Sequence, residues 1–263
     1  MLHNFARYLR HLPIVLKKLA VLHDHSVFLD EATPEQLNLS LRSWRIFKRG
    51  QGYLRSLIAD KCVDARGDPV PWYTYPAIEQ LSKWDFSKCD VLEYGCGNST
   101  LWWMARSNSV TSIESSREWR EYVIGQIGDN AEIILSPVGV DSKDHEQITD
   151  YIERVDQLGQ FDVIVIDGVN KPGVRNACAE RSLDHLKPGG LFIVDNSDWL
   201  PETCSMMRNA GFIEVDYSGL GPLNSHAETT TLFFKPDFAI RAINKEHPGY
   251  SIGGLQRNCD RGE

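Results

Sequence analysis

The sequence predicts an α/β protein with a mostly parallel sheet that carries helices on both faces. Apolar runs at residues 161–166 and 191–194 each end in an acid, Asp167 and Asp195. Continuous apolar runs of this length are typical of central strands buried on both faces. A helical stretch and a Pro-Gly-Gly turn lie between the two runs, which indicates a βαβ crossover. A third strand, at residues 91–94, leads directly into a glycine turn.

The first predicted strand and turn lie in residues 91–100. The strand contains Glu93, and Gly95 and Gly97 form a tight turn after it. Ser99 and Thr100 can cap a helix that starts around Leu101. Because glycine has no Cβ, the backbone N–H groups of such a turn can come close to a ligand.

The next predicted strand, residues 110–113, ends in Glu114. An acid about 20 residues beyond a glycine turn is the position that holds ribose hydroxyls in nucleotide-binding folds. The NAD fingerprint is not met, because its third glycine would be Thr100. A phosphate-binding Lys-Ser or Lys-Thr pair does not follow the turn either. The pattern therefore favours a nucleoside site.

The remaining elements complete the sheet. A helix is expected over 176–186, residues 187–190 end it, and residues 191–194 form the next strand. Residues 212–217 and 229–235 alternate in polarity, which is typical of an antiparallel edge hairpin.

Over residues 74–236 this order resembles the class I S-adenosylmethionine (SAM) dependent methyltransferases. Residues 93–97 match the acid-x-Gly-x-Gly motif, and residues 186–190, Leu-Lys-Pro-Gly-Gly, match a feature before the fifth strand. The resemblance implies a seven-stranded Rossmann-like sheet and SAM as the methyl donor. The residues that it implies for cofactor binding are Glu93, Gly95, Gly97, Asn98, Ser99 and Glu114, with Tyr75 and Asp167 beside them.

Polar side chains follow the two central strands. Asp167, Asp195 and Asn196 should converge, because the carboxyl ends of neighbouring parallel strands meet at one edge. Oxygen ligands of this kind suit Mg²⁺ or Mn²⁺. The set resembles that of catechol-type and macrolide sugar O-methyltransferases, which implies a metal-assisted reaction. The alternative is that these residues only finish strands and cap helices, as in metal-free methyltransferases.

Three residues are candidates for catalysis. Asp167 could accept a proton, and His226 lies in the connection before the last strand. The resemblance to the catechol type implies Lys171 as the candidate for its catalytic lysine. A loop histidine can equally be just solvated. Trp72, Tyr73 and Tyr75 either lie against the cofactor or acceptor or anchor the packing of the core.

The chain is predicted to comprise a helical extension and lead-in loop (1–73), the methyltransferase core (74–236) and a loosely held tail (237–263). Within the extension, residues 34–60 are expected to be helical. Residues 1–22 interleave basic and apolar positions. They form either an amphipathic helix packed on protein or a peripheral contact with an anionic membrane, at the inner face.

Composition narrows the function further. A net charge of −8 argues against a general nucleic-acid binder, and six cysteines without C-x-x-C spacing fit a reduced, cytoplasmic protein. We expect O-methylation of a small-molecule or glycan hydroxyl. The alternatives are methylation of nitrogen or of a macromolecule, and a non-catalytic SAM-binding module. The sequence leaves the oligomeric state open.

Overall fold

The computed structural model describes residues 33–139, 144–244 and 249–254. The chain divides between Arg45 and Ile46 into two compact units, and helix α2 (Pro34–Arg45) belongs to the first. The predictions for residues 1–22 lie outside the described residues. Within the described ranges, the longest apolar helices fall short of what is needed to cross a membrane.

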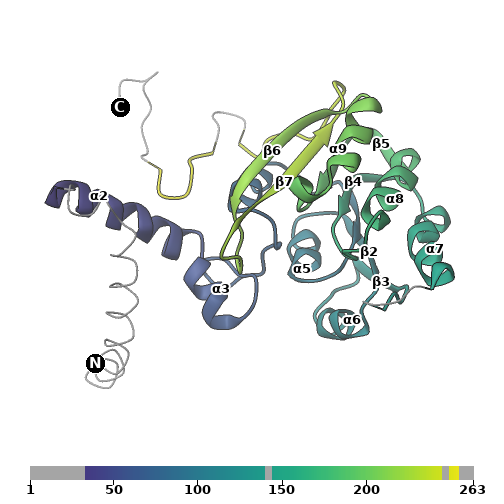
Figure 1. Ribbon diagram of the computed structural model, residues 1–263, viewed down its shortest axis with the longest axis horizontal. Coiled ribbons are helices and arrows are strands. Elements are labelled where there is room, and N and C mark those ends of the chain that lie inside the picture. Colours follow the sequence, from purple (N-terminus) through teal and green to yellow (C-terminus); the bar gives the residue numbers. More distant parts are fainter. Residues whose placement is uncertain (1–32, 140–143, 245–248, 255–263) are drawn as a thin grey trace. The chain divides into compact units, whose positions relative to one another are not determined.

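The second unit is built on a seven-stranded sheet in the order β3-β2-β1-β4-β5-β7-β6 (Figure 1). Strands β1 to β5 are parallel, whereas β7 pairs antiparallel with both β5 and β6. This confirms the predicted mostly parallel sheet with a terminal hairpin. The strands are β1 (Asp90–Tyr94), β2 (Ser109–Glu114), β3 (Ala131–Leu135), β4 (Phe161–Ile166), β5 (Leu186–Val194), β6 (Ile213–Leu220) and β7 (Ala227–Phe234).

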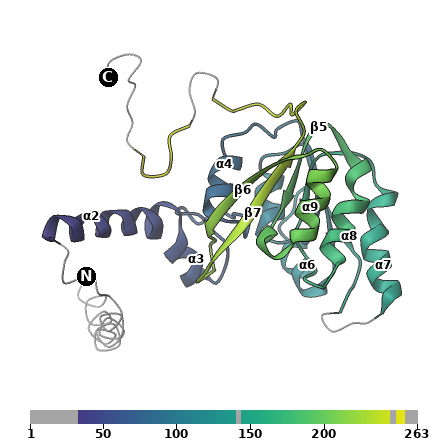
Figure 2. The ribbon, with the colours of Figure 1, turned by 45° about the horizontal axis from the view of Figure 1, so that its top comes forward.

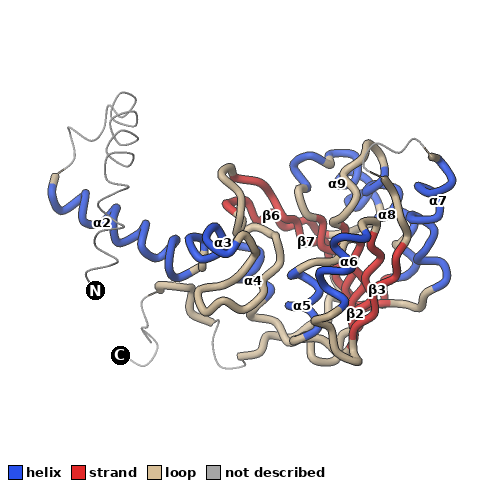
Figure 3. Tube along the Cα trace, turned by 90° about the horizontal axis from the view of Figure 1, so that it is seen from below, coloured by secondary structure: helices blue, strands red, loops and turns tan. Residues whose placement is uncertain are grey.

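Alternate residues of the central strands build two separate cores. In β4, Val163 and Val165 face the α4 and α5 side, and Ile164 and Ile166 face the α8 side. Figure 3 shows the sheet between these two helix layers, and Figure 2 shows α7, α8 and α9 side by side on one of them. The helices are α3 (Tyr53–Ala59), α4 (Tyr75–Leu81), α5 (Asn98–Met104), α6 (Arg117–Ile124), α7 (His145–Glu153), α8 (Val174–Arg181) and α9 (Pro201–Asn209).

Several boundaries differ from the sequence prediction. The stretch 34–60 is interrupted after the π-helical turn Ile46–Gly50, because Gly52 adopts a left-handed φ of 89° before α3. Helix α5 begins at Asn98 rather than near Leu101, and the Thr100 hydroxyl accepts a hydrogen bond from the Gly97 N–H at 3.1 Å. Thr100 therefore caps the helix from inside its first turn.

Strand β5 begins at Leu186, so the Pro-Gly-Gly segment lies in a strand and not in a turn. Helix α8 has already ended at Arg181. A shift of register between Phe161 and Val163 accommodates the segment opposite β4. A Cβ at Gly190 would lie 2.8 Å from the Asp162 carbonyl oxygen, so the close approach of the strands explains this glycine.

Segments outside the predicted core also pack on it. Cys62 and Val70, from the expected lead-in, are buried in the α4 and α5 core. In the expected tail, Phe238 packs against Trp84 with the ring centroids 5.0 Å apart, and the Ile243 N–H donates to the Lys83 carbonyl at 2.9 Å. Residues 237–243 are thus held against the sheet unit, contrary to the expected loose tail.

Candidate functional site

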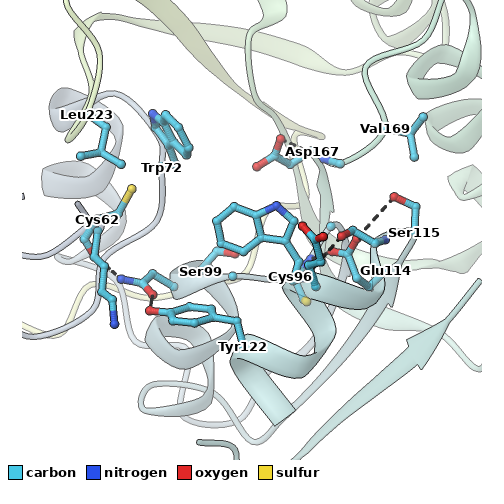
Figure 4. A pocket seen from close by; sticks show the side chains of 18 of the residues that line it. Cys62, Trp72, Cys96, Ser99, Glu114, Ser115, Tyr122, Asp167, Val169 and Leu223 are labelled. Atoms are coloured by element: carbon cyan, nitrogen blue, oxygen red, sulfur yellow. Dashed lines mark hydrogen bonds between the residues drawn. The ribbon is translucent and has the colours of Figure 1, made fainter. Parts of the chain in front are cut away.

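A cavity of about 780 Å³ opens at the carboxyl ends of β1, β2 and β4 (Figure 4). Strand β1 lies between β2 and β4, where the chain order along the sheet reverses, and ligands of open α/β sheets bind at such a point. Its walls come from the glycine turn, from the end of β2 with α6, and from the end of β4. Residues 60–62 after α3, Trp72, and Leu223 of the β6–β7 connection complete them. The lining residues are Asp60, Lys61, Cys62, Trp72, Gly95, Cys96, Gly97, Asn98, Ser99, Glu114, Ser115, Ser116, Glu118, Trp119, Tyr122, Asp167, Gly168, Val169 and Leu223.

The glycine turn is packed backbone to backbone against the loop after β4. Gly95 has a left-handed φ of 94°, and a Cβ there would lie 2.7 Å from the Gly168 nitrogen. Gly97 differs, because its φ of 173° is extended and a Cβ would meet the Trp119 ring at an ordinary 3.9 Å. Gly95 is therefore required by the fold, whereas Gly97 lines the cavity and no close contact requires a glycine there.

Glu93 lies beneath the turn and does not line the cavity. Its Oε1 accepts hydrogen bonds from the Ser112 hydroxyl at 2.6 Å and from the Thr100 hydroxyl. Burial raises the pKa of this carboxyl to about 7, although both hydroxyls oppose the shift. Glu93 therefore joins β1 to β2 and α5 beneath the cavity, and its predicted contact with a cofactor is not seen from the cavity side.

Glu114 lines the cavity at the end of β2. Its carboxylate accepts the Cys96 N–H at 2.6 Å and the Ser116 N–H at 2.5 Å, and the Ser115 hydroxyl lies 3.3 Å from Oε1. These bonds fix the carboxylate between the glycine turn and α6. Because each carboxylate oxygen can accept more than one hydrogen bond, Glu114 can still receive ligand hydroxyls.

The opposite rim is closed by Asn98. Its amide donates to the Cys62 carbonyl at 2.5 Å and accepts the Tyr122 hydroxyl at 3.0 Å. The Lys61 ammonium lies 5.0 Å from the Tyr122 ring centroid, and Trp119 meets the same ring edge-on at 5.9 Å. Asn98 therefore joins α5, α6 and the segment after α3, while Ser99 lines the floor beside it.

The strand-end polar residues converge as predicted, but around an arginine. Arg175, at the start of α8 and buried, donates from Nη2 to Asp167 Oδ1 at 3.0 Å and from Nη1 to Asn196 Oδ1 at 3.0 Å. It also donates to the carbonyls of Gly168 and Asp195 at 2.9 and 3.0 Å. The guanidinium thus binds the side-chain oxygens of Asp167 and Asn196, two of the three residues that the sequence assigned to a metal.

The Asp195 carboxyl group is also poorly suited to bind a metal ion. Its carboxyl is buried, with Oδ1 accepting the Thr230 hydroxyl at 2.7 Å. Burial, and then the nearby Asp167 charge, raise its pKa well above the usual range, which favours the protonated form. Across the described ranges, no group of three or more His, Cys, Asp or Glu is placed to hold a metal ion. The residues present therefore do not fit Mg²⁺ or Mn²⁺, and the structure does not support the predicted metal site at Asp167, Asp195 and Asn196.

Other predicted residues lie apart from the cavity. Tyr75 is buried in the core beside Phe47 and borders a smaller cavity near Trp102. His226 is exposed, and Lys171 is half-buried in the loop before α8 without lining the cavity. The β6–β7 connection does reach the cavity, but through Leu223.

Comparisons with known proteins bear on the family. Residues 92–197 match a family model described as a methyltransferase domain. This match spans the glycine turn, Glu114 and Asp167, which line one cavity, and also Arg175 and Asn196, which hold Asp167 from behind. Residues 92–197 carry a methyltransferase domain. No curated protein sequence matches the chain.

Solved structures with similar sheets are distant in sequence. An rRNA methylase from Streptococcus thermophilus is 16% identical, with 61% of this chain and 96% of that one covered and a TM-score of 0.44. Precorrin-6y C5,15-methyltransferase from Geobacter metallireducens is 13% identical, with 61% and 87% covered and a TM-score of 0.45. N-methyltransferase NodS from Bradyrhizobium japonicum, with S-adenosylhomocysteine, is 13% identical, with 72% and 99% covered and a TM-score of 0.42. The methyltransferase assignment rests on the sequence match and on the site.

Proposed function

We propose that this methyltransferase transfers a methyl group from SAM to a hydroxyl of a small molecule or glycan without a bound metal. The observation that carries the proposal is that Glu114, the Gly95–Gly97 turn and Asp167 face one cavity from three adjacent strands. When bound, SAM supplies an electrophilic methyl group on a sulfonium. In this proposal Glu114 binds the ribose hydroxyls, and the turn lies against the rest of the donor.

Asp167 is the proposed proton acceptor. Both hydrogen bonds described for its side chain end at Oδ1, from Arg175 at 3.0 Å and from the Gly168 N–H at 2.9 Å. Figure 4 shows its carboxyl group directed into the cavity. As the acceptor oxygen forms its bond to the methyl carbon and the carbon–sulfur bond breaks, the hydroxyl proton passes to Asp167. The side chain is 30% exposed, so the proton can continue to solvent.

Arg175 and Asn196 are positioning residues in this scheme, because they hold the Asp167 carboxylate and do not line the cavity. The guanidinium is permanently charged, so its hydrogen bond to Asp167 is charge-assisted and fixes the orientation of the carboxylate. The proposed proton transfer does not use Lys171 or His226.

Calorimetry with Glu114→Gln tests the donor site. Loss of charge-assisted bonds to the ribose should weaken SAM binding by about 1–3 kcal/mol. Glu121→Gln is the matched control, since Glu121 is an exposed carboxylate on the adjacent helix α6 that does not line the cavity, and its loss should leave affinity unchanged. Equal SAM affinity for both variants would refute the ribose assignment, and methylation confined to amine acceptors would favour nitrogen as the target.

A further inference from the structure

The end of the cavity away from Glu114 has an aromatic wall. Trp72, Leu223 and Cys62 lie on one side, and Figure 4 shows Asp167 across from them with its carboxyl group toward Trp72. Trp72 is 41% exposed, so one part of a large apolar ring is open to the cavity. An indole in this position offers a flat surface next to the proposed proton acceptor.

The orientation of Trp72 is fixed by a chain of buried hydrogen bonds. Its Nε1 donates to Asn224 Oδ1 at 2.9 Å, and the Asn224 amide donates to Glu228 Oε1. Asn196 donates to the other oxygen of Glu228 at 2.7 Å and accepts from Arg175 at 3.0 Å. Both oxygens of Glu228 thus receive an amide hydrogen, one from each direction.

This series of hydrogen bonds ends at Asp167, which lines the cavity as Trp72 does. Arg175 donates to Asp167, so Trp72 and Asp167 are joined through four intervening side chains. Those side chains come from α8, the end of β5, β7 and the β6–β7 connection. Glu228 stands in the middle and is only 4% exposed. A buried carboxylate is costly unless its oxygens are hydrogen-bonded, so this arrangement favours one geometry of its partners.

We propose that Trp72 is the stacking platform of an acceptor subsite for an uncharged, hydroxylated ring, and that Glu228, acting through Asn224, holds the indole in place. The inference rests on the methyl-transfer function proposed above. A ring lying on the indole would present its hydroxyl toward Asp167.

The charge of the cavity defines the class of acceptor. Its lining includes four carboxylates and one lysine, namely Asp60, Glu114, Glu118, Asp167 and Lys61. Such a surface attracts a cationic donor and disfavours an acceptor that carries a carboxylate or phosphate. Indole faces bind the flat faces of aromatic and sugar rings. The favoured acceptor is therefore a neutral phenol or sugar.

Indole N–H resonances of ¹⁵N-tryptophan-labelled protein test both parts of the proposal, namely that Glu228 positions Trp72 and that Trp72 binds a ring. The sequence contains seven tryptophans, and Trp72→Phe identifies the Trp72 signal by its loss. Glu228→Gln should shift that signal and leave S-adenosylhomocysteine affinity within about twofold of the wild type. Glu214→Gln is the matched control, because Glu214 lies on the same hairpin but pairs with Arg208. An unmoved Trp72 signal in Glu228→Gln would overturn the positioning role.

Ring binding is measured on the wild type saturated with S-adenosylhomocysteine. Phenol and methyl β-glucopyranoside are compared with 4-hydroxybenzoate and methyl β-glucuronide. At least one neutral probe should move the Trp72 signal, its anionic counterpart should bind more weakly, and Trp72→Ala should weaken the neutral probe roughly tenfold.

The two neutral probes separate a phenolic from a sugar acceptor. An unchanged Trp72 signal with both, or stronger binding of the anions, would overturn the subsite. If S-adenosylhomocysteine itself fails to bind, the proposed function fails first. The wild-type and Trp72→Ala measurements do not depend on whether Glu228→Gln folds.

Discussion

The buried Glu93 carboxyl should make the stability of the protein depend on pH. In the folded protein its pKa is raised from 4.5 to about 7, chiefly by burial. Between these two values the unfolded chain loses this proton while the folded chain keeps it, so stability falls as pH rises. The full difference corresponds to about 3 kcal/mol, because one pKa unit is worth about 1.4 kcal/mol. From about pH 5 to about pH 8, most of this loss should be seen.

Glu93→Gln isolates the effect, because an amide does not titrate. Urea unfolding, followed by tryptophan fluorescence at several pH values, gives the unfolding free energy of both proteins. Asp195 and Glu228, whose pKa values are also raised by burial, contribute to both, so the difference between the two curves is the quantity of interest. The wild type should lose roughly 2–3 kcal/mol more than the variant across this range. Parallel curves would show that Glu93 is not titrating, and would refute the assignment of a buried, neutral carboxyl.

Further outcomes are expected. Arg175→Met should destabilise the protein by roughly 3 kcal/mol, because it leaves Asp167 and Asn196 without their partner. Methyl transfer by the wild type should be unchanged in EDTA, and activity that collapses in chelator and returns with Mg²⁺ would contradict the metal-free proposal. Gly95→Ala should destabilise by about 2 kcal/mol or more, whereas Gly97→Ala should stay within about 0.5 kcal/mol of the wild type in thermal unfolding yet weaken SAM binding; equal stabilities would contradict the role of the Gly168 contact. Deleting residues 1–22 should leave SAM affinity within a few-fold, and sedimentation with anionic and neutral vesicles at two salt concentrations tests the membrane alternative, which equal non-binding would exclude.

The central strands were predictable because their side chains obey simple rules. Val163 to Ile166 form an unbroken apolar run, since both faces of β4 are buried. Strand β3 was not located from the sequence, because it is an edge strand in which only Ile133 is buried. Edge strands lack the continuous apolar signal on which such predictions depend.

The candidate site was predictable only where position along the chain determines position in space. Glu114 and Asp167 follow strands, and the ends of parallel strands must meet at one edge of the sheet. The role of Arg175 depends on which way the first turn of α8 faces, and the role of Glu228 depends on pairing between β5 and β7. Side-chain chemistry alone made Asp167, Asp195 and Asn196 look like metal ligands, because a cation supplied from a helix is not visible in a strand-end motif.

The guanidinium of Arg175 also affects which acceptors can be regioselectively methylated. A divalent ion can expand its coordination shell and chelate two vicinal hydroxyls of a substrate, which both orients the diol and acidifies one oxygen. Arg175 cannot replace such an ion, since its Nη atoms already donate to Asp167, Gly168, Asp195 and Asn196 and the residue does not line the cavity. An isolated hydroxyl should consequently serve as well as a vicinal diol. Selection among the hydroxyls of a polyol then depends on the shape of the cavity rather than on bidentate chelation.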